Sequence, residues 1–228
     1  PHISTPAGIN ELHNSVEQVV LNDIANIPFT FIRGVKYMSE SFEDFDVMRG
    51  EETELMGIVS SDYGKCIYIL PGSHSKIINT DENNRISGFS TMLSGEMIWA
   101  ISQNTILKDA VDMTVREIDE VYLLKGFDYC KSEGINKALF KVRILKNCFN
   151  CAKIELYSFF IGIILCGEIQ EIIKSNAETV VIGGKSQLKN AIVTLLKNRD
   201  SKKIISLDEK TVEYSTTLGA IRIFEKRV

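Results

Sequence analysis

The sequence has no concentration of positive charge and no long apolar segment. Its 26 lysines and arginines are dispersed among 30 aspartates and glutamates, which gives a net charge of −4. Without a basic run to follow a phosphate backbone, the chain is not expected to bind nucleic acid. The longest strongly apolar stretch, Leu156 to Ile169, is interrupted by Ser158 and Cys166. It is shorter than the about 20 residues of a membrane-spanning helix, so we predict a buried core helix and no membrane partner.

Cysteine is too irregular in number and position for a disulfide framework. The five cysteines are an odd count in a chain long enough to bury its own core. They favour a reducing compartment, so we expect a cytoplasmic location. Cys148 and Cys151 have the spacing of half a zinc site or of a redox pair. Because no second such pair occurs and the three histidines lie far away in sequence, we predict ordinary thiols and no metal site.

The first residues, Pro1 to Pro6, include neither an initiator methionine nor the basic and apolar regions of a signal peptide. They are typical of the interior of a longer protein. Internal repeats, low-complexity tracts and a clear flexible linker are also absent from the sequence.

Apolar spacing predicts alternating helices and strands, and hence a mixed α/β fold. We expect helices over residues 9–23, 51–58, 94–107, 133–144, 152–173, 186–196 and 211–224. We expect strands over residues 27–32, 66–70, 77–80, 86–92, 179–182 and 203–206. The strands on either side of Gly72 should form an antiparallel hairpin pair, and Trp99 is expected in the core.

The turn from Leu70 to Lys76 is one candidate site. Gly72 allows backbone angles that other residues avoid, and the hydroxyls of Ser73 and Ser75 lie beside backbone N–H groups. Such a turn can hold a phosphate, with Lys76 or His74 adding charge. The alternative is an ordinary hairpin with a surface lysine and a structural histidine.

A second candidate site begins the predicted helix at residue 51. Glu51 and Glu52 would lie in the first turn, where the helix dipole keeps carboxylates ionised, and either could accept a proton or hold Mg²⁺ through water. Arg49 could pair bidentately with a carboxylate, since a planar guanidinium suits that geometry. Ordinary first-turn acids and an internal salt bridge are the alternatives.

Two further positions are weaker candidates. Gly183 and Gly184 end a predicted buried strand, where absent side chains would let a ligand approach the backbone. A simple turn explains the pair equally well. Glu96, at the start of a predicted helix, is expected either to line a cleft or to be solvent exposed.

Taken in order, three stretches resemble consecutive signatures of the 2-dehydro-3-deoxygalactonokinase family. They are Asp46 to Gly57, Leu70 to Lys76 and Phe89 to Glu96. Further matches are Leu139 to Arg143, Phe160 to Gly162 with Gly167-Glu168, and the strand end Val180 to Gly184. The resemblance covers nearly all of the chain, although each piece alone has little specificity.

This resemblance implies ATP-dependent phosphorylation of a 2-keto-3-deoxy sugar acid, 2-dehydro-3-deoxygalactonate to its 6-phosphate in galactonate catabolism, with ATP and Mg²⁺ as cofactors. It implies the ribonuclease-H-like fold of actin-like ATPases, in which mixed sheets flanked by helices form two lobes around a cleft. Residues 1–35 would be the remainder of the N-terminal lobe and residues 36–228 the C-terminal lobe. The partners would be the sugar acid and ATP, with homodimer formation left open.

The resemblance also suggests roles for the candidate residues. Gly72, Ser73, His74, Ser75 and Lys76 would hold phosphate, and Gly183 and Gly184 would form the adenosine motif. Either Glu51 or Glu52 would be the general base. Arg49 and Glu96 would bind substrate.

The chain departs from the family in one respect. Kinases of this superfamily begin with a strand hairpin carrying an Asp-x-Gly-Thr-Thr type segment, and no such segment occurs here. We expect either that a longer protein supplies it or that catalysis has been lost. The second case would leave a non-catalytic module that binds a nucleotide or a sugar acid.

Overall fold

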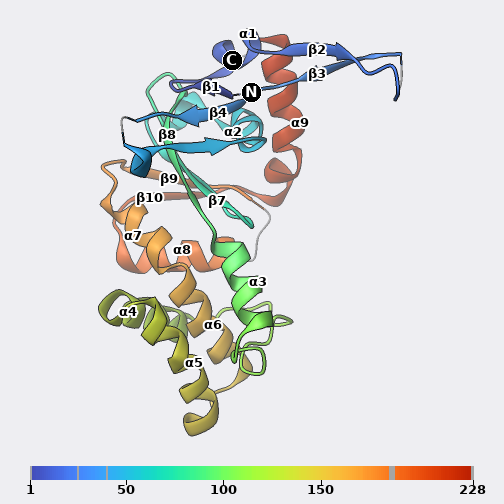
Figure 1. The fold of residues 1–228 in the computed structure, drawn as a ribbon. Coiled ribbons are helices and arrows are strands. Elements are labelled where there is room, and N and C mark those ends of the chain that lie inside the picture. Colours follow the sequence, from blue (N-terminus) through green and yellow to red (C-terminus); the bar gives the residue numbers. More distant parts are fainter. Residues whose placement is uncertain (1, 25, 40, 185–187, 227–228) are drawn as a thin grey trace.

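The computed structural model describes residues 2–24, 26–39, 41–184 and 188–226. Its centre is a five-stranded mixed sheet in the order β10-β9-β6-β7-β8 (Figure 1). The bounds of these strands are β6 Ile67–Leu70, β7 Ser75–Thr80, β8 Ile86–Met92, β9 Thr179–Ile182 and β10 Lys203–Ser206. β6, β7 and β8 form an antiparallel meander, whereas β6, β9 and β10 run parallel. The predicted mixed α/β class and the hairpin pair around Gly72 are thus confirmed.

The two faces of this sheet belong to two hydrophobic clusters. Along β6, Ile67 and Ile69 lie in one cluster, whereas Tyr68 and Leu70 lie in the other. Successive strand side chains point to opposite faces, so a strand that is covered on both sides must be apolar throughout. This explains the unbroken apolar runs from which the strands were predicted.

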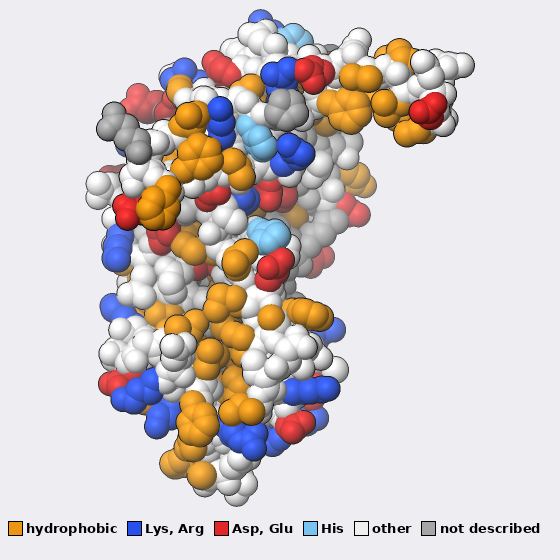
Figure 2. All heavy atoms as spheres, viewed as in Figure 1, with side chains coloured by type: hydrophobic (Ala, Val, Ile, Leu, Met, Phe, Trp, Pro, Cys, Tyr) orange, Lys and Arg blue, Asp and Glu red, His pale blue; other side chains and the backbone are white. Residues whose placement is uncertain are grey.

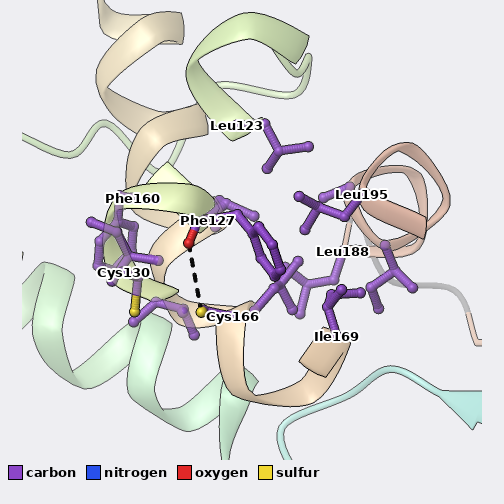
Figure 3. Packing of buried hydrophobic residues seen from close by; sticks show 14 of the residues in the cluster. Leu123, Phe127, Cys130, Phe160, Cys166, Ile169, Leu188 and Leu195 are labelled. Atoms are coloured by element: carbon purple, nitrogen blue, oxygen red, sulfur yellow. Dashed lines mark hydrogen bonds between the residues drawn. The ribbon is translucent and has the colours of Figure 1, made fainter. Parts of the chain in front are cut away.

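The first cluster lies between the sheet and a group of helices below it in Figure 1. Their bounds are α3 Ser94–Asn104, α4 Glu120–Glu133, α5 Ile135–Phe149, α6 Lys153–Ile164, α7 Cys166–Lys174 and α8 Leu188–Arg199. Figure 3 shows Phe127, Phe160 and Leu195 as members of this cluster from three of these helices, with Phe160 beside Cys130. The thiol of Cys166 donates to the Phe127 carbonyl at 3.6 Å. The first two residues of the helix predicted over 186–196 lie outside the described residues.

Two expectations for this region are wrong. The predicted helix over 152–173 is two helices, because the chain bends at Leu165 between α6 and α7. Trp99 is 65% exposed rather than buried, since its face of α3 lies over a pocket instead of the core. Within the described ranges no single helix has the length and apolarity to cross a membrane, and α6 and α7 meet that test only as a pair bent by 48°.

The second cluster is covered by α1 Ile9–Asn14, α2 Glu51–Ile58, α9 Glu209–Glu225 and a three-stranded sheet. That sheet has the order β1-β4-β5, with bounds β1 His2–Ser4, β4 Gly34–Tyr37 and β5 Asp46–Met48. The division expected after residue 35 falls inside β4, which pairs with both neighbours.

A separate hairpin, β2 Glu17–Val20 and β3 Pro28–Phe31, extends from this layer and carries exposed apolar side chains (Figures 1 and 2). The single helix predicted over 9–23 is therefore wrong beyond Asn14. Val19 and Val20 are β-branched and pair with β3, and this pairing prevails over their helical spacing.

α2 and α9 cross with their backbones in direct contact. A Cβ at Gly57 of α2 would lie 1.8 Å from the Ser215 carbonyl oxygen, and one at Gly219 of α9 would lie 1.8 Å from the Thr53 carbonyl oxygen. Glycine at both positions therefore sets how closely the two helices approach. This contact fixes α2, whose first turn carries Glu51 and Glu52, against the upper layer.

Candidate functional site

Two of the candidate sites, the Gly72 turn and the Gly183-Gly184 strand end, meet at one edge of the central sheet. β6 and β9 are parallel neighbours, with Ile69 opposite Ile182, so their carboxyl ends leave the sheet side by side. The Gly183 N–H donates to the Ile69 carbonyl at 2.9 Å. Gly184 has φ +74°, and a Cβ there would lie 2.8 Å from Cδ of Pro71, so only glycine fits this position without strain.

The Gly72 turn is organised by Ser75. The buried Ser75 hydroxyl accepts from the Gly72 N–H at 3.3 Å, whereas Ser73 and His74 are exposed. Gly72 does not use the left-handed conformation that glycine permits, and the position of a Cβ there is open space. The backbone angles therefore do not require glycine at this position. Its lack of a side chain leaves the backbone of the turn open to a ligand.

The start of α3 packs directly on this turn. A Cβ at Gly95 would lie 2.3 Å from the Gly72 carbonyl oxygen, and the Glu96 N–H donates to the Ser73 carbonyl at 3.2 Å. The exposed side chain of Glu96 also lies 3.0 Å from Nε2 of His74. The structure thus brings Glu96 together with the Gly72 turn, and it engages His74 in a pair with that carboxylate.

Lys76 is not a surface lysine. It is 4% exposed, and its Nζ donates to the Val47 carbonyl at 2.9 Å and to the Thr91 hydroxyl at 2.5 Å. Thr91 in turn donates to the Asp46 carboxylate at 2.9 Å. The ammonium therefore connects β7 and β8 to the segment that precedes Arg49, which explains why a charged residue is buried here.

The two glutamates at the start of α2 differ in their surroundings. Glu52 is 2% exposed, and both of its carboxylate oxygens accept from the Gly50 N–H, at 3.0 and 2.7 Å. Burial raises the pKa of Glu52. Glu51 is only partly buried and accepts from the Arg49 N–H at 3.0 Å. Gly50 has φ +109°, so this loop also depends on glycine.

Arg49 is exposed at the end of β5. Burial is the main reason that the pKa of His2 is lowered, and the positive charge of Arg49 lowers it further. The two side chains therefore lie in the same neighbourhood. The exposed guanidinium of Arg49 suits an anionic group.

A pocket of about 500 Å³ opens beside the Gly72 turn. Its lining combines the turn and the start of α3 with apolar side chains, namely Gly72, Ser73, Gly95, Glu96, Ile98, Trp99, Met113, Tyr157 and Leu188. Sequence reasoning missed Trp99, Met113, Tyr157 and Leu188. An available signal was Trp99 itself, only three residues after Glu96 and on the same helix.

The fold and the site define a mixed α/β protein with a glycine-bordered, partly apolar pocket at the carboxyl ends of parallel strands. A family model described as 2-keto-3-deoxy-galactonokinase matches residues 1–215, and the chain belongs to this family.

Two known proteins are similar to this chain, one in sequence and one in fold. The chain is 34% identical over 113 residues to a protein of Rhizobium meliloti (strain 1021) named "Probable 2-dehydro-3-deoxygalactonokinase DgoK1", a match that covers 48% of this chain and 34% of that protein. It therefore spans about a third of the length of that curated relative. A crystal structure of a Sinorhizobium meliloti protein, provisionally named a 2-dehydro-3-deoxygalactonokinase, superposes with a TM-score of 0.83 at 22% identity. That alignment covers 99% of this chain and 72% of the other, and it establishes the shared fold.

Proposed function

We propose that this chain forms part of an ATP-dependent kinase that phosphorylates 2-dehydro-3-deoxygalactonate at its 6-hydroxyl. The observation that carries this proposal is the convergence of the Gly72 turn, the Gly183-Gly184 strand end and the Trp99 pocket at one sheet edge. Family membership supports the sugar-acid substrate and the use of ATP. Phosphoryl transfer needs positioning and charge stabilisation more than covalent chemistry from the protein, and these elements supply positioning.

The nucleotide would lie along this edge. At Gly72 the open space at the Cβ position would let a phosphate approach the backbone N–H groups of the turn, and the Ser73 hydroxyl is exposed beside it. The absence of a side chain at Gly184 would let the nucleotide follow the strand end. Trp99 offers an aromatic face on which the base would stack.

The sugar acid would lie near the start of α2. Arg49 would pair with its carboxylate, since its guanidinium is exposed and can bind two oxygens at once. Glu51 is the better candidate for the general base because its carboxylate is accessible, whereas Glu52 is buried and holds the Gly50 loop.

Mg²⁺ would neutralise phosphate charge in the bound complex. Among the described residues no three metal-binding side chains converge. This fits a Mg²⁺ ion held mainly by phosphates and water, with Glu51 as the protein group that would contact it through water.

The wider arrangement is also part of this proposal. The five-stranded mixed sheet with helices on both faces supports a ribonuclease-H-like lobe of an actin-like ATPase. We assign residues 36–228 to that lobe and residues 1–35, whose β1 pairs with β4, to the remainder of a second lobe. In the complete kinase the two lobes would form a cleft. A cytoplasmic location and a homodimer belong to the same proposal.

The test is a coupled assay of ADP release from ATP and Mg²⁺ with 2-dehydro-3-deoxygalactonate, together with calorimetric titration of ATP. ADP release that depends on the sugar acid is expected. Heat of ATP binding without ADP release would indicate a non-catalytic binding module instead. The absence of both binding heat and ADP release would refute the proposal.

Matched variants test the assigned roles. Glu51→Gln should lower kcat about 100-fold with little change in the KM for ATP if Glu51 is the base. Gly72→Ala should fold normally, because its Cβ meets open space, but should weaken ATP binding. The control is Gly167→Ala on α7, whose Cβ also meets open space and which should change neither kcat nor ATP binding.

A further inference from the structure

A buried carboxyl group lies beneath the start of α3. Glu168 of α7 is 1% exposed, and its Oε2 accepts from the Ser94 hydroxyl at 2.6 Å. Its other oxygen, Oε1, is buried without a hydrogen-bond partner among the residues that the structure describes. Burial of a polar atom without a partner is unfavourable, so this carboxyl group costs stability. This cost suggests that the group has a role in function.

Ser94 links this carboxyl group to the Gly72 turn. Ser94 is the first residue of α3, and it is itself buried. The next two residues, Gly95 and Glu96, are those that contact the turn through the Gly72 carbonyl oxygen and the Ser73 carbonyl. Any shift of Ser94 therefore moves the backbone against which the turn is packed.

We propose that Glu168 is a positioning residue for the phosphate turn, acting through its hydrogen bond to Ser94 on the start of α3. This inference rests on the proposed function for its catalytic consequence, though not for its structural one. The short Ser94–Glu168 bond has the length of a hydroxyl donating to an ionised carboxylate. Protonation of Glu168 would replace it by a neutral bond of different strength and length and so shift the start of α3.

This protonation would occur near neutral pH. Burial is the main reason that the pKa of Glu168 is raised to about 7, and the charge of Glu171 adds to it. The charge that acts on Glu168 is that of Glu171, which accepts from Ser90 of β8. Charged side chains on the neighbouring helices are engaged elsewhere. They include Glu96 of α3, which is paired with His74, Asp128 of α4, which is paired with Arg199 of α8, and Lys189 of α8, which donates to the Leu207 carbonyl.

Trp99 allows the structural step to be measured without catalysis. It is the only tryptophan of the chain, it is exposed, and it lies on α3 five residues after Ser94. Tryptophan emission of the wild-type protein, titrated from pH 5 to pH 9, should show an inflection near pH 7. Glu168→Gln should remove this inflection, because the amide does not titrate.

The control variant is His74→Gln, which removes the imidazole that is paired with Glu96 near the start of α3. The inflection should persist in this variant. An inflection that survives in Glu168→Gln, or that is lost in His74→Gln, would overturn the proposal. A wild-type titration without any inflection would do the same.

The catalytic consequence is tested with Ser94 variants. Ser94→Ala removes the donor and should raise the KM for ATP about tenfold with a smaller change in kcat. Ser94→Thr keeps the hydroxyl and should restore the wild-type value. If wild-type protein releases no ADP, the proposed function fails while the fluorescence titration still decides the role of Glu168. If it is active and Ser94→Ala matches it in KM and in pH profile, the positioning role is wrong.

Discussion

The crossing of α2 and α9 gives a direct test of the packing. In Gly219→Ala the new Cβ would lie 1.8 Å from the Thr53 carbonyl oxygen, whereas ordinary contacts begin at 3.4 Å. The two helices must therefore separate by about 1.6 Å, the difference between these distances. Neither neighbour is the free end of a flexible side chain, because the contact joins one helix backbone to another.

The cost follows from what the separation disturbs. α2 and α9 together bury Leu55, Met56, Val212 and Ile223 in the second cluster. Overpacking of a core costs about 1–3 kcal/mol, and a rigid backbone contact places this variant at the upper end, about 3 kcal/mol. That is a large part of the about 5–15 kcal/mol that stabilises a typical domain.

Urea denaturation followed by circular dichroism measures the effect. Gly167→Ala is the matched control, since nothing lies near its Cβ, and alanine should stabilise α7 by about 0.5–1 kcal/mol. Adding Gly57→Ala to Gly219→Ala should cost less than the sum of the two, because one separation relieves both contacts. A Gly219→Ala protein as stable as the Gly167→Ala control would refute the close crossing.

Three further outcomes are expected. The native pKa of Glu168 is raised to about 7 from 4.5, so its contribution to stability is complete below pH 4.5 and is lost as the pH rises through 7. The loss amounts to at most about 3 kcal/mol. Urea midpoints should therefore be lower at pH 8 than at pH 5, and Glu168→Gln should reduce this difference. Lys76→Met leaves the Val47 carbonyl without its donor and should destabilise the protein by about 2 kcal/mol in the same assay, and an unchanged midpoint would contradict the buried contacts. Glu52→Ala removes both oxygens that accept from the Gly50 N–H and should lower the free energy of unfolding by about 1–2 kcal/mol, and a cost below that of Glu51→Ala would contradict this role.

The strands of the central sheet and α2 could be predicted because their sequence pattern and their burial agree, whereas β1, β2, β4 and β5 were not predicted. Residues 67–70 and 179–182 form apolar runs of strand length, and both faces of the sheet they form are covered. The helix that begins at Glu51 follows a glycine and opens with acidic residues, as helix starts commonly do.

The remaining features depend on contacts between segments distant in sequence. The strand at Val19 and Val20 requires its partner β3, which local spacing does not reveal. The burial of Lys76 depends on the Val47 carbonyl, 29 residues earlier in the chain. Glu168 in its apolar stretch was a visible signal for a buried carboxylate, but its partner Ser94 lies 74 residues away.

The parallel pairing of β6 with β9 also bears on the order of folding. Ile69 and Ile182 are 113 positions apart, and α3 to α7 lie between them in the chain. Pairings of such long sequence separation form slowly, because the entropy of closing a long loop must be lost before any contact compensates for it. The β6–β8 meander is local and can form early, whereas the edge at which Pro71 meets Gly184 exists only after β6 and β9 have paired. Ligand binding at this edge would therefore report that this long-range pairing has formed.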